Sequence, residues 1–440
     1  MKTSKITKCC LSLILCAALL LPLGIGAGAT GDVTGSKTYT ITNPYETVNW
    51  NTWDHYKANL HTHSTVSDGK DAIVDVIEAY YAGGYDILAM TDHGVVNRGW
   101  NVMPTPVPIL SFNMILGRPI PLSDERYTQI TTGSDRGGRG MTDVPFGIEL
   151  NAAVLTKSHV NGFFVDYGQN DWGKENDYEG PIAAVDALGG LTHINHPGDW
   201  LGSAKDINIA KDPKNIKFFA DILKKYPSCL GIEVLNDRDS PTRHDRVLWD
   251  GLLESVIPTG RNVWGFANSD SHKMESIDTS FEVFMMPSNT VDNVRTAMET
   301  GTFFACGRTA RPELGDEFRG EGQYPVVTNI TVDHDLQRIA IEGTDYDTIQ
   351  WIAKGEIIAT GNSIDLNAHE DEIGRYVRAQ LKGPGGICFT QAFGTDDGTP
   401  PTPEPQENFF VTLWNDFVFA IKSTRIYVLF DMLIKEIAKK

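Results

Sequence analysis

The chain has 440 residues, with 38 Lys and Arg against 57 Asp and Glu, a formal net charge of −19 and a hydrophobic content of 41%. That apolar content is enough for one large core and a second, smaller one. The acidic balance argues against nucleic acid as a partner, because phosphate contacts need a basic surface. A small phosphorylated substrate remains compatible with it, since bound metal ions create a local positive site.

Residues 1–29 have the pattern of a secretory signal peptide. A basic start is followed by an apolar run at 9–21 and by the small residues Ala27-Gly28-Ala29. The apolar run is shorter than the roughly 20 residues that a membrane span needs. We therefore expect an exported protein, extracellular or in the cell envelope, whose mature chain begins at or near Thr30. Residues 30–54 then form an N-terminal segment.

Three of the six cysteines leave with that signal. Cys229, Cys306 and Cys388 remain, an odd number at wide spacing. The sequence therefore implies no disulfide framework, and it leaves room for one bridge without saying which.

The first chemical motif is His61-Thr62-His63, at the end of a strand predicted for 56–60. Side chains alternate along a strand, so His61 and His63 point the same way. Asp68 follows five residues later. Two imidazoles and a carboxylate suit a divalent metal of borderline softness. One such motif also recurs by chance, so the metal prediction depends on the motifs that follow.

Further strand-like segments end in residues of the same types. A helix predicted for 71–81 leads into a strand at 86–90, which gives a βαβ unit. The ligand-type motifs after it are Asp92-His93, Gly147-Ile148-Glu149, the single His159, His196-Pro197 and Asp270-Ser271-His272. A β/α barrel keeps its active site at the C-terminal ends of its strands. These motifs therefore predict one site at one end of an α/β fold.

In this order the motifs resemble the PHP family, the polymerase and histidinol phosphatase metallohydrolases. The resemblance covers roughly residues 55–310, within a catalytic barrel that we place at 55–315. It implies a distorted seven-stranded, TIM-like β/α barrel with two or three divalent ions, either Mn, Zn or Fe. The ligands that it implies are His61, His63, Asp68, His93, Glu149, His159, His196, Asp270 and His272. Among them, we expect Asp68, Glu149 and His272 to have catalytic roles.

Other polar residues near these motifs are not in that ligand set. Asp92 could hydrogen-bond a ligand histidine. His193 is either a catalytic acid or a core residue, and the core is favoured. Glu233 and Asn236 end another predicted strand, so they could contact either the ligands or the substrate.

An insert at 97–146 separates two of the ligand motifs and shows no clear periodicity. It is either a variable surface loop or a lid over the metals. In the second case Arg136 and Arg139 would bind an anionic substrate. Arg308, which follows the last predicted helix of the barrel, is a third candidate for a phosphate contact, with a surface position equally expected.

The pattern changes after residue 324. Short segments that alternate apolar and polar residues predict a small antiparallel β-sandwich at 324–394. A Pro/Thr linker at 395–408 leads to an aromatic tail at 409–440 with helical periodicity. Charged residues interrupt this tail, so we expect an amphipathic helix that lies on a membrane surface or docks on the envelope.

The function expected from these features is hydrolysis of a phosphate ester. Two ions that share a water lower its pKa and supply hydroxide near neutral pH. One alternative keeps the metals and cleaves an amide or a lactone. Another is a non-catalytic envelope-binding protein, against which the complete ligand set argues.

Overall fold

The structure is a computed structural model that describes residues 37–105, 120–152 and 157–400, with a few single residues between 413 and 427. The expected signal peptide and most of the expected linker and helical tail lie outside these ranges. Within them, no helix has the length and apolar character needed to cross a membrane.

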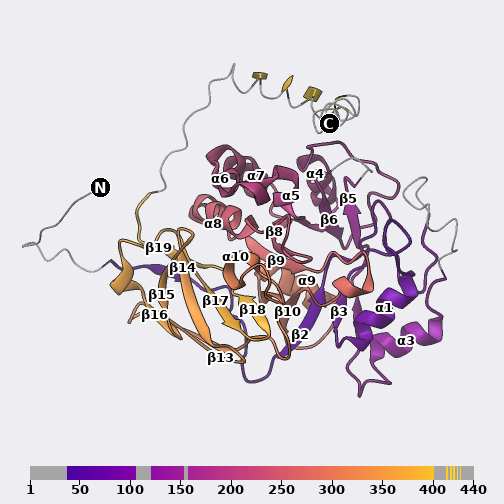
Figure 1. The fold of residues 1–440 in the computed structure, drawn as a ribbon, viewed down its shortest axis with the longest axis horizontal. Coiled ribbons are helices and arrows are strands. Elements are labelled where there is room, and N and C mark those ends of the chain that lie inside the picture. The colour runs from indigo at the N-terminus through magenta and orange to yellow at the C-terminus, as the bar shows by residue number, and fades with distance from the viewer. Residues whose placement is uncertain are drawn as a thin grey trace, which may run out of the picture. The chain divides into compact units, whose positions relative to one another are not determined.

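The described residues form a mixed α/β fold with three sheets (Figure 1). In the largest sheet, β2 (Asp54–Asn59), β3 (Ile87–Leu88) and β4 (Thr142–Asp143) are parallel, while β10 (Ser280–Met286) pairs antiparallel with β2 and with β11 (Phe303–Gly307). The second sheet contains, in spatial order, β5 (Ile148–Leu150), β6 (Val160–Phe163), β7 (Leu191–Ile194), β8 (Cys229–Asn236) and β9 (Trp264–Asn268). The α/β class predicted from the sequence is therefore confirmed.

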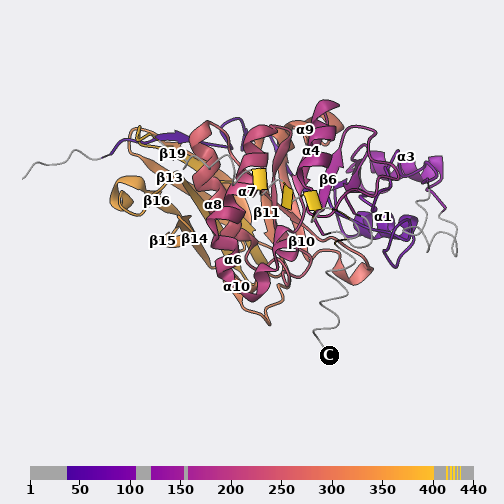
Figure 2. The same cartoon turned by 90° about the horizontal axis from the view of Figure 1, so that it is seen from above.

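Helices connect and cover these strands. They are α1 (Ile73–Ala82), α3 (Asp124–Thr132), α4 (Glu179–Ala187), α5 (Pro197–Leu201), α6 (Ile207–Lys211), α7 (Pro213–Lys225), α8 (Asp245–Val256), α9 (Val291–Thr300) and α10 (Arg311–Leu314). The apolar stripe predicted for 71–81 is the buried face of α1, which ends at Gly83. Helices α7 and α8 lie side by side and pack on β8 (Figures 1 and 2).

Two isolated parallel bridges connect the first two sheets. One joins Thr62 to Ser271 and the other joins His93 to Glu149, so each lies at or beside an expected metal ligand. Pairing between the sheets is not continuous. In addition, β5 and β6 are antiparallel, because the nine residues at 151–159 are too few for the crossover that a parallel pair needs. A closed seven-stranded barrel therefore stays a prediction.

The C-terminal strands are arranged differently from the prediction. The short strands expected after residue 324 are present as β12 (Val326–Asp333), β13 (Arg338–Thr344), β14 (Thr348–Ala353), β15 (Glu356–Thr360), β16 (Ser363–Asp365), β17 (Tyr376–Gly383), β18 (Gly386–Phe389) and β19 (Phe393–Asp396). Only β12, β13 and β16 form a sheet of their own. Strand β18 pairs with β11, and β19 pairs with β1 (Thr40–Thr42). The predicted separate sandwich at 324–394 is instead partly a continuation of the main sheet, since the sequence pattern gave strand character but not the strand's neighbour.

Candidate metal centre

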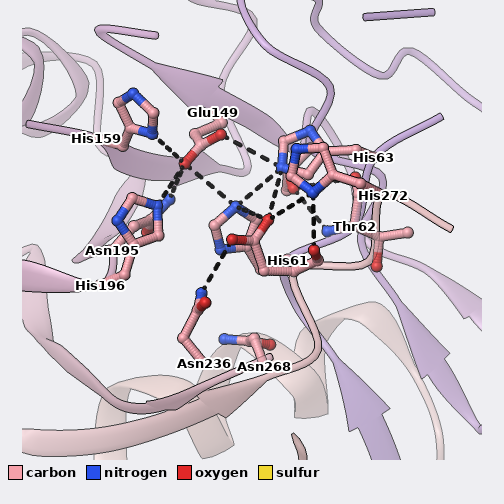
Figure 3. A network of polar contacts seen from close by, with 12 residues as sticks. His61, Thr62, His63, Glu149, His159, Asn195, His196, Asn236, Asn268 and His272 are labelled. Carbon is pink, nitrogen blue, oxygen red and sulfur yellow. Dashed lines mark hydrogen bonds and ion pairs between the residues drawn. The ribbon is translucent and has the colours of Figure 1, made fainter. Parts of the chain in front are cut away.

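The nine expected ligands gather at one end of the first two sheets, although the first and last are 211 positions apart in the chain. Figure 3 shows His61, His63, Glu149, His159, His196 and His272 among them. Their ligand atoms fall into four overlapping groups, within each of which the atoms lie within 4.8 Å of one another. The groups are His63, Asp68, His93 and His272; His61, Glu149 and His196; His61, His63 and Asp270; and His93, Glu149 and His159.

Glu149 lies at the centre of this arrangement and is fully buried. Its Oε1 lies 3.2 Å from His61 Nε2, 2.9 Å from His159 Nδ1 and 3.4 Å from His196 Nε2. Its Oε2 lies 2.6 Å from His93 Nδ1 and 3.4 Å from His63 Nε2. A carboxylate whose two oxygens face different imidazoles is placed to bridge two cations.

Two aspartates complete the arrangement. Asp270 Oδ1 lies 3.3 Å from His61 Nε2 and 3.0 Å from His63 Nε2. Asp68 lies 3.4 Å from His93 Nε2 and 3.3 Å from His272 Nε2. The Asp68 side chain is 50% exposed and that of His272 is 37% exposed, so this side of the centre faces solvent.

The charges of the centre support one another. Burial raises the pKa of Asp68, but hydrogen bonds from His272 and His93 outweigh it and hold that pKa far below its usual range. Burial likewise lowers the pKa of His272, whereas Asp270 and Asp68 raise it, with a net value of about 9. The carboxylates are therefore ionised at neutral pH, which is the state that ligates a metal.

Glu233 orients His61 from behind. Its Oε1 lies 2.8 Å from His61 Nδ1, which leaves Nε2 to face Glu149 and Asp270. Glu233 also accepts hydrogen bonds from the His196 backbone N–H and from the side chains of Asn236 and Asn268. A carboxylate that holds the far nitrogen of a histidine in this way is typical of metal sites. Glu233 was expected to contact either a ligand or the substrate, and the structure shows the contact with the expected ligand His61.

Two ligands have unusual backbone angles. His196 has φ 28° and Asp270 has φ 43°. Positive φ costs energy for residues with a side chain and is concentrated at functional sites. The fold thus maintains two strained positions where both side chains face Glu149 or its neighbours.

These residues fit divalent cations. Imidazole nitrogens and carboxylate oxygens are the donors that Zn, Mn and Fe take in proteins. Buried polar atoms without a hydrogen-bond partner include His63 Nδ1 and His196 Nδ1. Buried polar groups are nearly always satisfied, so unsatisfied atoms of ligand type in one cluster indicate a bound ion.

Comparisons with known proteins bear on the fold alone. No family model matches the chain, and no curated protein matches it. A two-domain protein from Bacteroides vulgatus ATCC 8482, containing a predicted PHP-like metal-dependent phosphoesterase, is 15% identical, with a TM-score of 0.41, over 79% of this chain and 88% of that one. A lesion-specific endonuclease from Pyrococcus furiosus is 13% identical, with a TM-score of 0.32, over 56% of each chain. A putative metal-dependent phosphoesterase from Bifidobacterium adolescentis ATCC 15703 is 13% identical, with a TM-score of 0.28, over 49% of this chain and 87% of that one.

The chain is similar to PHP-like metal-dependent phosphoesterases, as its motifs indicate. All three TM-scores lie below 0.5 and all identities below 25%.

Asp92 has a different partner from the one expected. Its carboxylate accepts hydrogen bonds from the backbone N–H and the hydroxyl of both Ser64 and Ser67, at 2.7–3.1 Å. No described ligand histidine is among its hydrogen-bond partners. Asp92 therefore fixes the loop that carries Asp68 rather than a ligand itself.

His193 packs in the core, as the favoured interpretation predicts. Its ring stacks on Phe266 at 4.6 Å and lies 5.5 Å from Phe163. Burial lowers its pKa to about 4, so the ring is neutral. Asn195, two positions further on, was not predicted, yet it donates to Glu149 Oε1 at 2.8 Å. Its place between two histidines was the available signal.

The three arginines proposed for substrate binding are engaged elsewhere. Arg139 makes two hydrogen bonds to Asp86, and Arg136 binds Asp86 and the backbone carbonyls of Tyr81 and Tyr85. Asp86 precedes β3, whereas the ligand His93 follows it, so these contacts lie at the opposite end of the strand. The expectation that Arg136 and Arg139 bind substrate is therefore corrected: a buried carboxylate at the strand's start holds both.

Arg308 does not reach the ligands either. Its Nε lies 3.0 Å from Asp278, and Nη1 donates to the carbonyls of Gly322 and Gly385. These contacts attach the end of β11 to neighbouring loops. The guanidinium is thus used for structure, which corrects its assignment as a substrate contact.

Proposed function

We propose that this chain is a metal-dependent hydrolase that cleaves phosphate esters with two or three divalent ions. The observation that carries the proposal is the position of Glu149, with five imidazole nitrogens within 3.4 Å of its two oxygens. Such an arrangement is costly in a buried site unless cations occupy it.

Bound divalent ions would supply a water of lowered pKa and polarise the ester. The residues of the chain prepare this chemistry. Glu233 fixes the orientation of His61. Asn195 donates to Glu149 Oε1 and is itself held by Asn161, whose Oδ1 accepts a second hydrogen bond from it. The substrate would approach from the side of Asp68 and His272, because Glu149 and His61 are fully buried.

Within the centre we assign Glu149 to bridging two ions and Asp68 and His272 to a further position on the exposed side. The groups of ligand atoms support this division. Asp68 and His272 occur together in a group without Glu149, whereas Glu149 occurs with His159 in one group and with His196 in another; His93 belongs to both sides. Export, and attachment to a surface through residues 409–440, also remain part of the proposal.

The test is a substrate screen of the purified full chain. The protein is stripped with a chelator, reloaded with Mn, Zn or Fe, and assayed against phosphomonoesters, phosphodiesters, amides and lactones. Turnover of phosphate esters alone supports the proposal. Turnover of amides or lactones without phosphatase activity supports the alternative hydrolase, and metal binding without any turnover contradicts both.

Two variants make this screen specific. Glu149→Gln should lose turnover. Glu299→Gln, which changes an exposed carboxylate paired with Arg295 on α9, should keep it.

A further inference from the structure

Two of the three cysteines outside the expected signal lie opposite one another in neighbouring strands. Cys306 in β11 is the register partner of Cys388 in β18, with Ala305 opposite Phe389 and Gly307 opposite Ile387 on either side. Both cysteines are buried, at 0% and 1% exposure, and neither is bonded in the structure.

Their side chains share one face of the sheet. Residues directly opposite in an antiparallel pair project to the same side. Cys306 and Cys388 accordingly belong to one apolar cluster, whereas their neighbours Ala305 and Phe389 belong to another. The Cys306 thiol is in hydrogen-bond contact with Cys388, and burial together with this contact raises its pKa well above the usual range.

The spacing suits a covalent bond. Directly opposite residues in antiparallel strands have Cα atoms roughly 4.5–5.5 Å apart. Disulfides need roughly 4.4–6.8 Å. The third cysteine, Cys229, lies in β8 and has Thr192 opposite it, so it does not compete for either partner.

We propose that Cys306 and Cys388 form an intramolecular disulfide when the chain folds in the presence of a small-molecule disulfide oxidant. A Cys306 or Cys388 thiolate attacks the oxidant, one oxidant thiol leaves, and the second cysteine displaces the other. The two protein thiols are oxidised to one disulfide, two hydrogens are lost, and the oxidant is reduced to two thiols. Burial disfavours the thiolate in the finished core, so the exchange precedes closure of the core.

The bond would close a loop of 82 positions that contains β12 to β17. Closing a long loop stabilises a fold by restricting the unfolded chain. This inference is independent of the proposed function, because neither cysteine belongs to the groups of residues that could hold a metal ion.

The experiment is to refold the full chain from denaturant in a mixture of reduced and oxidised glutathione, block free thiols and map tryptic peptides by mass spectrometry. Peptide 296–308 contains only Cys306, and peptide 383–422 contains only Cys388. We expect them to be recovered as one linked species, lighter than their sum by two hydrogens, about 2 Da. The oxidised protein should also melt several degrees above the reduced one.

Cys306→Ser should abolish both the linked species and the difference in melting, while Cys229→Ser should keep both. Far-UV circular dichroism shows whether each variant folds. If Cys306→Ser does not fold, Cys388→Ser provides the same test. Recovery of both peptides with blocked thiols from folded wild-type protein would overturn the proposal, as would a link from either cysteine to Cys229.

Discussion

Glu149 is the residue on which most of the metal centre depends, because each of its oxygens faces a different set of imidazoles. Replacing it by Gln keeps the shape and removes the charge that offsets repulsion between two cations. We expect Glu149→Gln to lose ions on both sides of the carboxylate, whereas His159→Ala should deplete one and leave the other near full occupancy.

Metal analysis of the two purified variants, with Glu299→Gln as the surface control, measures this directly. Metal content at the wild-type level in Glu149→Gln, or equal losses in both variants, would mean that the carboxylate does not bridge.

Glu233 does not contact the ions in our proposal, but it accepts four hydrogen bonds, one of them from His61. The side chain of Gln at this position must turn its NH2 group toward at least one of those donors, and an NH2 group cannot accept a hydrogen bond. Loss of a partner that orients a ligand histidine typically weakens metal binding 10–100-fold. We expect a loss of about that size in Glu233→Gln, measured by competition with a chromophoric chelator.

A matched control for this variant is Glu254→Gln. Glu254 Oε1 accepts a hydrogen bond from the Arg375 backbone N–H, away from the ligands. An equal loss of metal affinity in both variants would show a general effect on the fold rather than the loss of a partner for His61.

At the scale of elements, the loop after β2 is attached to the loop after β3. Asp92 holds Ser64 and Ser67 by four hydrogen bonds, and Asp68 follows directly. Asp92→Ala should therefore release Asp68 and weaken the ion bound with His93 and His272, while the ion held by Glu149 and His159 is retained. A metal stoichiometry unchanged from wild type would refute this role.

A buried carboxyl group, that of Asp143, joins the end of the insert at 97–146 to its beginning. Asp143 accepts hydrogen bonds from Asn97 Nδ2 and the Trp100 backbone N–H, yet burial raises its pKa to about 7. The pKa of Asp143 is thus higher in the folded chain than its value of 3.8 in the unfolded chain. Asp143 therefore stabilises the fold fully below pH 3.8, and this stabilisation is lost as the pH rises through 7.

Asp143→Asn removes this dependence. Relative to wild type, its melting temperature should therefore rise between pH 5 and pH 8 when both proteins are metal-free. Asp166→Asn, which changes an exposed partner of Arg98, should show no such trend. A constant difference between Asp143→Asn and wild type across this pH range would contradict the prediction.

Across the whole molecule, the sequence predicted which histidines and carboxylates gather in one cluster better than it predicted the sheet. The clustering of His61 and His63 could be predicted because both follow a strand, and a strand's end fixes where the next side chains lie. Glu149 lies within the short strand β5, beside that same end of the fold. The pairing of Arg136 and Arg139 with Asp86 could not be predicted, because Asp86 is about 50 positions away and nothing in the local sequence pattern indicates it as their partner. The pairing of β18 with β11 was missed for the same reason: alternation indicates a strand, not its neighbour.

The pairing of β18 with β11 leads to a prediction about a truncated chain. A chain ending at residue 323 keeps every expected ligand but leaves β11 without β18 as a neighbour. Unpaired strand edges promote aggregation. We expect this truncation to be insoluble or to bind little metal, whereas a chain ending at residue 400 should be soluble and bind metal as the full chain does. A soluble, metal-loaded 1–323 protein would show that the C-terminal strands are dispensable.

The position of β18 also has a consequence for the order in which the protein is made. Translation proceeds from the N-terminus, so every expected ligand has been synthesised by residue 272, more than a hundred residues before β18. From the synthesis of β11 until that of β18, the edge of β11 lacks the strand that covers it. Domains usually fold as units while the chain is being made. Here the main sheet is completed only when β19, which ends at Asp396, has left the ribosome, so the sheet is completed well after every expected ligand has been made.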